Sequence, residues 1–128
     1  QPTYRYLYAR IPPQVAPAPA RFGVPPVPHL KPIGAPHACE IPYCLGNLDL
    51  VQDIPWTDDD YRVSATMQAA FAQFIKTGNP NGPGVPNWPA ATAEDPAPPV
   101  MTIDVQSQAA PSTVEARYQF LDRVCAAR

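Results

Sequence analysis

Proline is the feature that most limits what this chain can fold into, because 20 of its 128 residues are proline. Proline fixes φ and carries no N–H, so long helices and central strands can form only where it is rare. A proline-punctuated stretch runs over residues 12–36, and we expect it to be a long irregular loop. With 45% hydrophobic and 16% charged residues, the composition is nevertheless that of part of a folded protein.

Charge and hydropathy argue against two classes of partner. Nine Lys and Arg stand against eleven Asp and Glu, and no basic run is present, so we expect no nucleic-acid partner. No apolar run approaches the ~18 residues that a membrane span needs. Gln1 is not preceded by an initiator Met or followed by a basic and apolar leader, so we expect the start of the chain to result from cleavage.

Two strands are expected. The run from Tyr4 to Ile11 is rich in aromatic residues and lacks Gly and Pro, so residues 1–11 are predicted to hold a strand. Neither of its faces is clearly polar, which favours a strand covered on both sides, as in an α/β sheet. A second, short strand is expected over residues 100–105.

Residues 57–77 are predicted to form the clearest helix. Thr57 can cap the first turn, and the run from Asp58 to Asp60 places negative charge at the positive end of the helix dipole. We therefore expect this acidic run to be a helix cap and not a metal site. Gly78 is expected to end the helix. The apolar side chains of the helix recur at helical spacing: Val63, Met67, Ala70, Phe71 and Phe74. Because Phe71 and Phe74 fit this spacing, we expect them to be core residues and not part of a substrate pocket.

A second helix is expected over residues 112–126, where Ser112 and Glu115 have the spacing of a capping box. Its apolar stripe consists of Val114, Tyr118, Leu121 and Cys125. One or two strands and two helices are too few to build a sheet with both faces covered. We therefore expect another polypeptide to complete the core.

The chain contains two histidines, His29 and His37, and none of the glycine-rich nucleophile or phosphate-binding motifs that would accompany a complete catalytic site. His29 is interpreted as a surface loop residue. His37 begins a short apolar segment, residues 37–48, expected to form one or two helical turns interrupted by Pro42 and stopped by Gly46. A single histidine in a loop is more often a hydrogen-bonded structural residue than a catalytic one, so the residues alone favour a structural role for His37.

Three cysteines, Cys39, Cys44 and Cys125, match no zinc-binding spacing. Two interpretations stay open. The three thiols could be buried as small apolar groups, or a disulfide could join Cys39 or Cys44 to Cys125. A disulfide would favour a secreted or periplasmic protein.

The run from Ile33 to Leu48 resembles the histidine segment of the type-B carboxylesterases, the cholinesterase-like branch of the α/β-hydrolases. The shared pattern is Gly-x-x-His-(small)-x-Glu-Ile-x-(aromatic)-x-(apolar)-Gly. The run from Phe74 to Asn81 resembles the family's Phe-x-x-Thr-Gly-x-Pro-Asn signature, and Trp88-Pro89 resembles its Trp-Pro signature. The strand before the histidine segment and the helix after it are also similar to those of the family.

The resemblance implies an α/β fold class. Residues 1–128 would be the C-terminal part of one α/β-hydrolase catalytic domain, whose mostly parallel sheet is completed by a second, larger chain. His37 would be the general acid and base of a Ser-His-acid triad, with the Ser nucleophile and the Asp or Glu on that larger N-terminal chain. The expected reaction is hydrolysis of a small-molecule carboxylic ester through an acyl-serine intermediate, with no metal and no cofactor. The chain would be one part of a two-chain serine carboxylesterase, inactive alone.

Glu40 has two interpretations. The resemblance implies a buried carboxylate hydrogen-bonded behind the triad, whereas the spacing alone fits a surface carboxylate on the first turn of a short helix equally well. Two other functions for the whole chain also stay open. One is a non-catalytic, cholinesterase-like binding protein. The other is a free-standing proline-rich interaction module, against which the unpartnered helix stripes argue.

Overall fold

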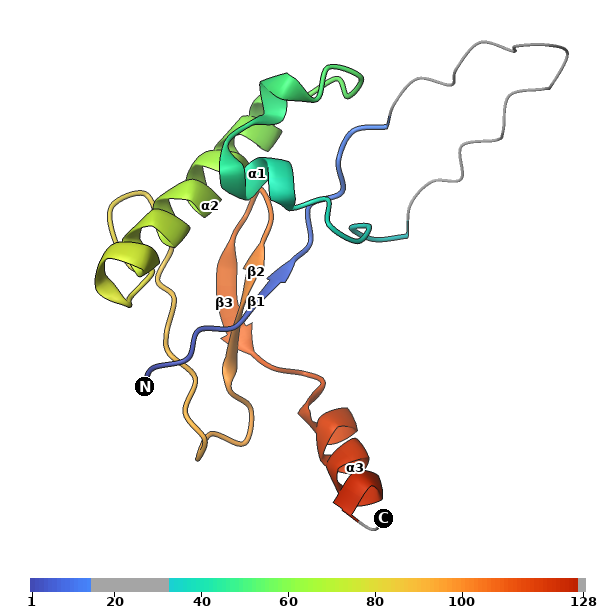
Figure 1. The fold of residues 1–128 in the computed structure, drawn as a ribbon. Coiled ribbons are helices and arrows are strands. Elements are labelled where there is room, and N and C mark those ends of the chain that lie inside the picture. Colours follow the sequence, from blue (N-terminus) through green and yellow to red (C-terminus); the bar gives the residue numbers. More distant parts are fainter. Residues whose placement is uncertain (15–32, 127–128) are drawn as a thin grey trace, which may run out of the picture.

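The structure is a computed structural model that describes residues 1–14 and 33–126. Most of the proline-rich stretch predicted to be a loop, including His29, lies outside these residues. Figure 1 shows a small sheet with helix α2 lying along it, helix α1 packed against α2, and helix α3 extending from the opposite end of the sheet. In chain order the elements are β1 (Tyr6–Tyr8), α1 (Ile41–Leu45), a 3-10 helix η1 (Leu48–Leu50), α2 (Asp58–Thr77), β2 (Pro99–Ile103), β3 (Gln108–Pro111) and α3 (Glu115–Ala126).

The three strands lie in the order β1-β2-β3. β1 pairs parallel to β2, with Tyr6 opposite Met101, so α1 and α2 lie on the crossover between two parallel strands. β2 and β3 form an antiparallel hairpin whose turn is closed by the Ser107 hydroxyl, which donates to the Asp104 carbonyl at 2.7 Å. This hairpin was not predicted, because β3 consists of Gln-Ala-Ala-Pro and lacks β-branched and aromatic residues.

β1 is much shorter than the strand predicted within residues 1–11. The register between β1 and β2 places Tyr4 opposite Pro99. Because proline has no N–H to donate to a neighbouring strand, the ladder does not extend back to Tyr4. Beyond β1, only an isolated bridge between Thr3 and Ala91 continues the pairing on that side. β2 also differs from the predicted 100–105, because Asp104 already belongs to the hairpin turn.

Helix α2 has nearly the predicted bounds, with Thr57 as its N-cap and Gly78 at φ +75° as its C-cap. The Asp60 carboxylate accepts the Thr57 N–H at 2.9 Å, which is half of a capping box. The inward face of the helix supplies Val63, Met67 and Ala70 to the core. The other buried apolar side chains of the core are Tyr43, Leu48, Trp88, Met101 and Ile103.

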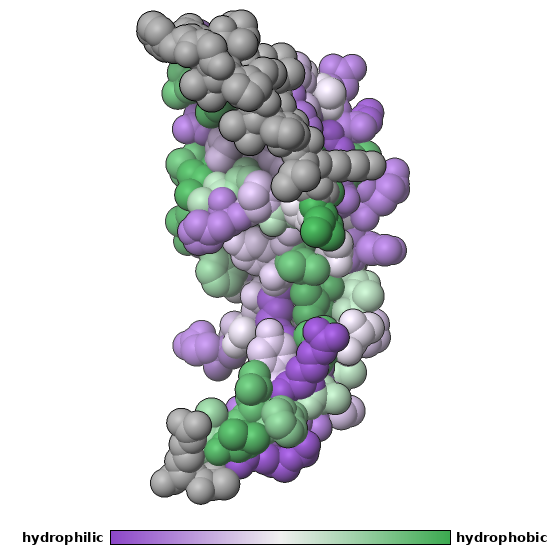
Figure 2. All heavy atoms as spheres, turned by 90° about the vertical axis from the view of Figure 1, so that its right-hand side faces the viewer, coloured by the Kyte–Doolittle hydropathy of each residue, from purple (hydrophilic) through white to green (hydrophobic). Residues whose placement is uncertain are grey.

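Helix α3 begins at Glu115 and not at residue 112. The backbone is still extended there, because β3 runs to Pro111 and the Ser112 N–H donates to the Pro98 carbonyl at 3.1 Å. None of the described α3 residues is buried, and Tyr118 and Leu121 are each 52% exposed. Figure 2 shows apolar side chains on the surface at the end of the molecule where α3 lies. The apolar stripe of α3 therefore has no partner within the described residues.

Candidate active site

His37 lies at the start of a turn, residues 37–40, that leads into α1, and its side chain is exposed. The turn is linked to the helix through the Ile41 N–H, which donates to the Ala38 carbonyl at 3.3 Å. Ala38 has φ +62°, a left-handed conformation that costs an L-residue about 1–2 kcal/mol. Strain of this kind persists where the surrounding structure demands it, often at functional sites. Among the described residues, no hydrogen bond joins His37 to a serine or a carboxylate.

Helix α1 fixes the chain directly after the His37 turn. Pro42 was expected to interrupt this segment, but it lies in the first helical turn, where its missing N–H has no intrahelical acceptor to lose. Gly46 ends the helix at φ +67°, as expected. A Cβ at Gly46 would meet the flexible end of the Gln68 side chain on α2, which would have to move aside.

A buried polar network lies between α1, the start of α2 and the segment after β1. The Tyr43 hydroxyl and Nε of Arg10 both donate to Asp60 Oδ1, each at 2.7 Å. Thr57 donates to Asp60 Oδ2 through its hydroxyl at 2.6 Å. Tyr43 and Asp60 are 0% exposed. Burial by itself would raise the pKa of Asp60, but the hydrogen bonds from Arg10, Thr57 and Tyr43 outweigh it and lower that pKa to about 2.

Glu40 occupies the N-cap position of α1 and is half-buried, but its side chain makes no capping hydrogen bond. Burial first, and then the negative charge of Glu40, raise the pKa of Tyr6 and of the thiols of Cys39 and Cys44. Glu40 is thus close to side chains of β1 and α1. The structure brings it into the same turn as His37.

The buried network was not predicted as part of a site. The sequence pattern identified Asp60 only as a helix-capping charge, and it assigned no role to Arg10 or to the Tyr43 hydroxyl. Thr57 and Asp60 have capping-box spacing, which is the one local signal that singles out this aspartate within the acidic run. The other two residues reach it from positions 50 and 17 residues away.

All three cysteines are free in the structure. Cys39 and Cys44 are only partly buried and Cys125 is exposed, so the structure bears out neither the interpretation as three buried thiols nor the alternative disulfide to Cys125. Within the described part of the chain, no group of three or more His, Cys, Asp or Glu side chains could hold a metal ion. No described helix combines the length and apolar character needed to cross a membrane.

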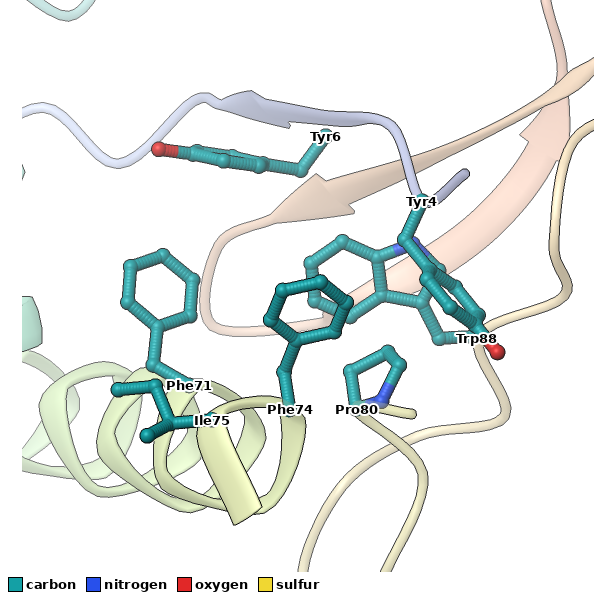
Figure 3. Close-up of a pocket in the computed structure, with 7 residues that line it drawn as sticks. All are labelled: Tyr4, Tyr6, Phe71, Phe74, Ile75, Pro80 and Trp88. Atoms are coloured by element: carbon teal, nitrogen blue, oxygen red, sulfur yellow. The ribbon is translucent and has the colours of Figure 1, made fainter. Parts of the chain in front are cut away.

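An aromatic groove of about 310 Å³ lies between β1 and α2. In Figure 3, Phe71 and Phe74 project from α2 toward Tyr6 on β1 and Tyr4 on the segment just before it. The rings of Tyr6 and Phe71 and those of Tyr4 and Phe74 pack edge to face, with centroids 5.8 and 6.0 Å apart. Phe71 packs against the core as predicted, whereas Phe74 remains 45% exposed. The full lining consists of Tyr4, Tyr6, Phe71, Phe74, Ile75, Pro80 and Trp88.

Comparison with known proteins defines the family. The model of the carboxylesterase family matches residues 1–121, and the chain therefore belongs to this family. It is 34% identical over 68 residues to cocaine esterase of Homo sapiens, a match that covers 53% of this chain and 12% of that protein. It is 44% identical over 57 residues to para-nitrobenzyl esterase of Bacillus subtilis, covering 42% of this chain and 12% of that protein. The chain thus spans only a small part of the length of these relatives.

Solved structures show the same relationship. A PNB esterase superimposes with a TM-score of 0.69 at 26% identity, covering 92% of this chain and 21% of that chain. A thermophilic PNB esterase superimposes with a TM-score of 0.67 at 27% identity over the same shares. The structural neighbours are esterases of the α/β-hydrolase fold, which confirms the predicted fold type for the described fragment.

Proposed function

We propose that this chain is the histidine-bearing part of a carboxylic ester hydrolase that works through a Ser-His-acid triad. The observation that carries the proposal is the placement of His37. An exposed imidazole is followed by a strained left-handed residue, Ala38, in a chain that belongs to the carboxylesterase family. His37 is available to groups that approach from another polypeptide segment.

The chemistry follows from the properties of imidazole. An imidazole ring can accept a proton near neutral pH and return it. His37 takes the proton of a serine hydroxyl as the serine attacks the ester carbonyl. It then gives the proton to the alcohol that departs. The acyl group remains on the serine, and water hydrolyses this acyl-serine intermediate. Glu40, half-buried in the same turn, is the carboxylate behind the triad in this proposal.

The serine, the triad acid and the amides that stabilise the oxyanion would lie on a larger polypeptide that completes the domain. Two observations support this part of the proposal. The chain corresponds to 21% of a PNB esterase on which 92% of it superimposes with a TM-score of 0.69. It also exposes apolar side chains on β1, α2 and α3 that a single core would bury, including Leu7 at 59% and Ile75 at 83% exposure. A secreted or periplasmic location stays a prediction, and the free thiols remove the disulfide argument for it.

Substitution of His37 tests the proposal directly in the assembled protein, the chain together with its larger partner. We expect His37→Ala to lower kcat on p-nitrophenyl acetate by roughly 10⁴- to 10⁶-fold, as the loss of a triad member does in other serine hydrolases. The matched control is His29→Ala, which removes the other histidine and should leave kcat unchanged. A His37→Ala enzyme with kcat within tenfold of wild type would contradict the proposal.

A serine-directed fluorophosphonate separates the enzyme from the binding-protein alternative. The reagent should label the larger partner polypeptide in the wild-type assembly and label it far more slowly in His37→Ala, because the histidine activates the serine. Equal labelling rates in the two proteins, or no labelling of either, would favour a non-catalytic role.

A further inference from the structure

We propose that Tyr43 is a positioning residue for His37, and that it acts by locking α1 onto α2. The proposal rests on the function proposed above and extends it to a residue outside the triad. Tyr43 lies six positions after His37, in the middle of α1, and is completely buried. Figure 1 shows α1 packed against α2, the longest of the described helices.

Two hydrogen bonds from opposite ends of Tyr43 attach it to α2. Its hydroxyl donates to Asp60 Oδ1 at 2.7 Å, and its backbone carbonyl accepts from the Ser64 hydroxyl at 2.8 Å. Asp60 and Ser64 are one turn apart on α2 and are 0% and 3% exposed. Because one bond holds the side chain and the other the backbone, together they fix both the place and the rotation of α1.

A continuous series of backbone hydrogen bonds transmits this position to His37. The Glu40 carbonyl accepts the Tyr43 N–H at 3.1 Å, and the Ala38 carbonyl accepts the Ile41 N–H at 3.3 Å. The Cys39 N–H in turn donates to the Pro36 carbonyl at 3.4 Å. Each residue between His37 and Tyr43 thus lies within a hydrogen-bonded turn, and a shift of α1 displaces the imidazole with it.

The hydroxyl of Tyr43 has a role separate from that of its ring. The ring packs edge to face against Tyr8 and Trp56, with centroids 5.4 and 5.5 Å apart. Phenylalanine at position 43 would keep these ring contacts and lose the hydroxyl that donates to Asp60. That bond is short and its acceptor is an ionised carboxylate, so it is among the stronger hydrogen bonds available to a neutral donor. A misplacement of about 1 Å at a reacting group can cost ~10²-fold in rate.

The experiment compares variants of the assembled protein on p-nitrophenyl acetate. We expect Tyr43→Phe to lower kcat about tenfold and to leave KM within about twofold, because the imidazole is displaced while substrate contacts stay in place. The matched control is Tyr61→Phe. Tyr61 lies on α2, and its hydroxyl, like that of Tyr43, donates to an aspartate. Its partner is Asp49 of η1, so this bond does not involve α1. Tyr61→Phe should leave both constants within about twofold of wild type.

A double-mutant cycle separates positioning from a general loss of structure. If Tyr43 acts through His37, adding Tyr43→Phe to His37→Ala causes no further loss of the residual activity. If the double variant loses the same factor as Tyr43→Phe alone, the proposal is wrong. Ser64→Ala independently removes the hydrogen bond from the Ser64 hydroxyl to the Tyr43 carbonyl. If Tyr43→Phe does not fold, the same double-mutant cycle with Ser64→Ala tests the positioning role.

The same measurements distinguish this proposal from the one on which it rests. If His37→Ala retains kcat within tenfold of wild type, the proposed function fails. If His37→Ala is inactive as expected but Tyr43→Phe and Ser64→Ala both stay within twofold of the Tyr61→Phe control, the positioning role alone fails.

Discussion

Arg10→Met removes the cation that faces the buried Asp60 carboxylate. Arg10 Nε lies 2.7 Å from Asp60 Oδ1, and the Asp60 side chain is 0% exposed, so water cannot replace the lost partner without a rearrangement. Removing one member of a buried ion pair typically costs about 3–5 kcal/mol, because it leaves an uncompensated charge. Tyr43 and Thr57 still donate to the carboxylate in the variant. We therefore expect the free energy of unfolding to fall by about 3 kcal/mol at pH 7, the lower end of that range.

The stability that Arg10→Met loses should be smaller at acidic pH than at pH 7. In the wild type the pKa of Asp60 is about 2, below the ordinary value of 3.8 that the unfolded chain has. Its stabilising contribution is therefore complete above that ordinary value and is lost as the pH falls toward 2. In Arg10→Met, burial is no longer balanced by the guanidinium, so the pKa of Asp60 rises. The variant then takes up a proton on acidification that the wild type does not, and the difference in stability shrinks.

Urea unfolding of the assembled protein, followed by tryptophan fluorescence at about pH 7 and pH 4, measures this difference. Arg5→Met is the matched control. Its ion pair with Glu115 has a similar distance, 2.8 Å, but side chains that are 30% and 21% exposed. Partial exposure weakens such a pair, so the control should lose much less stability. A loss at pH 7 no greater than that of Arg5→Met, or a loss that does not shrink at the lower pH, would refute the reasoning.

Three further substitutions test local features in the same unfolding assay. Gly46→Ala should cost about 1–2 kcal/mol, because alanine is disfavoured at φ +67° and its Cβ would displace the Gln68 amide. Met67→Ala removes a 0% exposed core side chain and should cost about 2–5 kcal/mol; a smaller loss would mean that the core collapses into the space. Ala38→Gly should raise the free energy of unfolding by about 0.5 kcal/mol, because relief of the left-handed strain exceeds the entropy that glycine adds to the unfolded chain. A lower free energy of unfolding in this variant would contradict the assignment of strain to Ala38.

Elements with local signals at both ends could be predicted from the sequence. Helix α2 has a capping residue, acidic side chains in its first turn, an apolar stripe and a terminal glycine, and its observed bounds differ little from the predicted ones. Strand ends lack such signals. β1 is limited by the position of Pro99 on a neighbouring strand more than 90 residues away, and no local pattern around Tyr6 contains that information.

The site divides in the same way. His37 and Glu40 are predicted as site residues because a local pattern around them resembles a known family, and the chain does belong to that family. The structure places both residues in one turn. The network around Asp60 had no such pattern, because Arg10, Tyr43 and Asp60 come from three separate segments and meet only in the folded chain.

Asp60 shows why a correct local prediction can still miss a function. Its Oδ2 accepts the backbone N–H and the hydroxyl of Thr57 at the start of α2, which is the capping role that the sequence indicates. Its Oδ1 accepts from Tyr43 and Arg10, which attach α1 and the segment after β1 to the same helix end. Capping requires only that the carboxylate lie near the first turn, whereas the second role requires burial and two distant donors. One carboxylate therefore both begins the helix and anchors the segment that carries His37, and the second role can be inferred only from the tertiary structure.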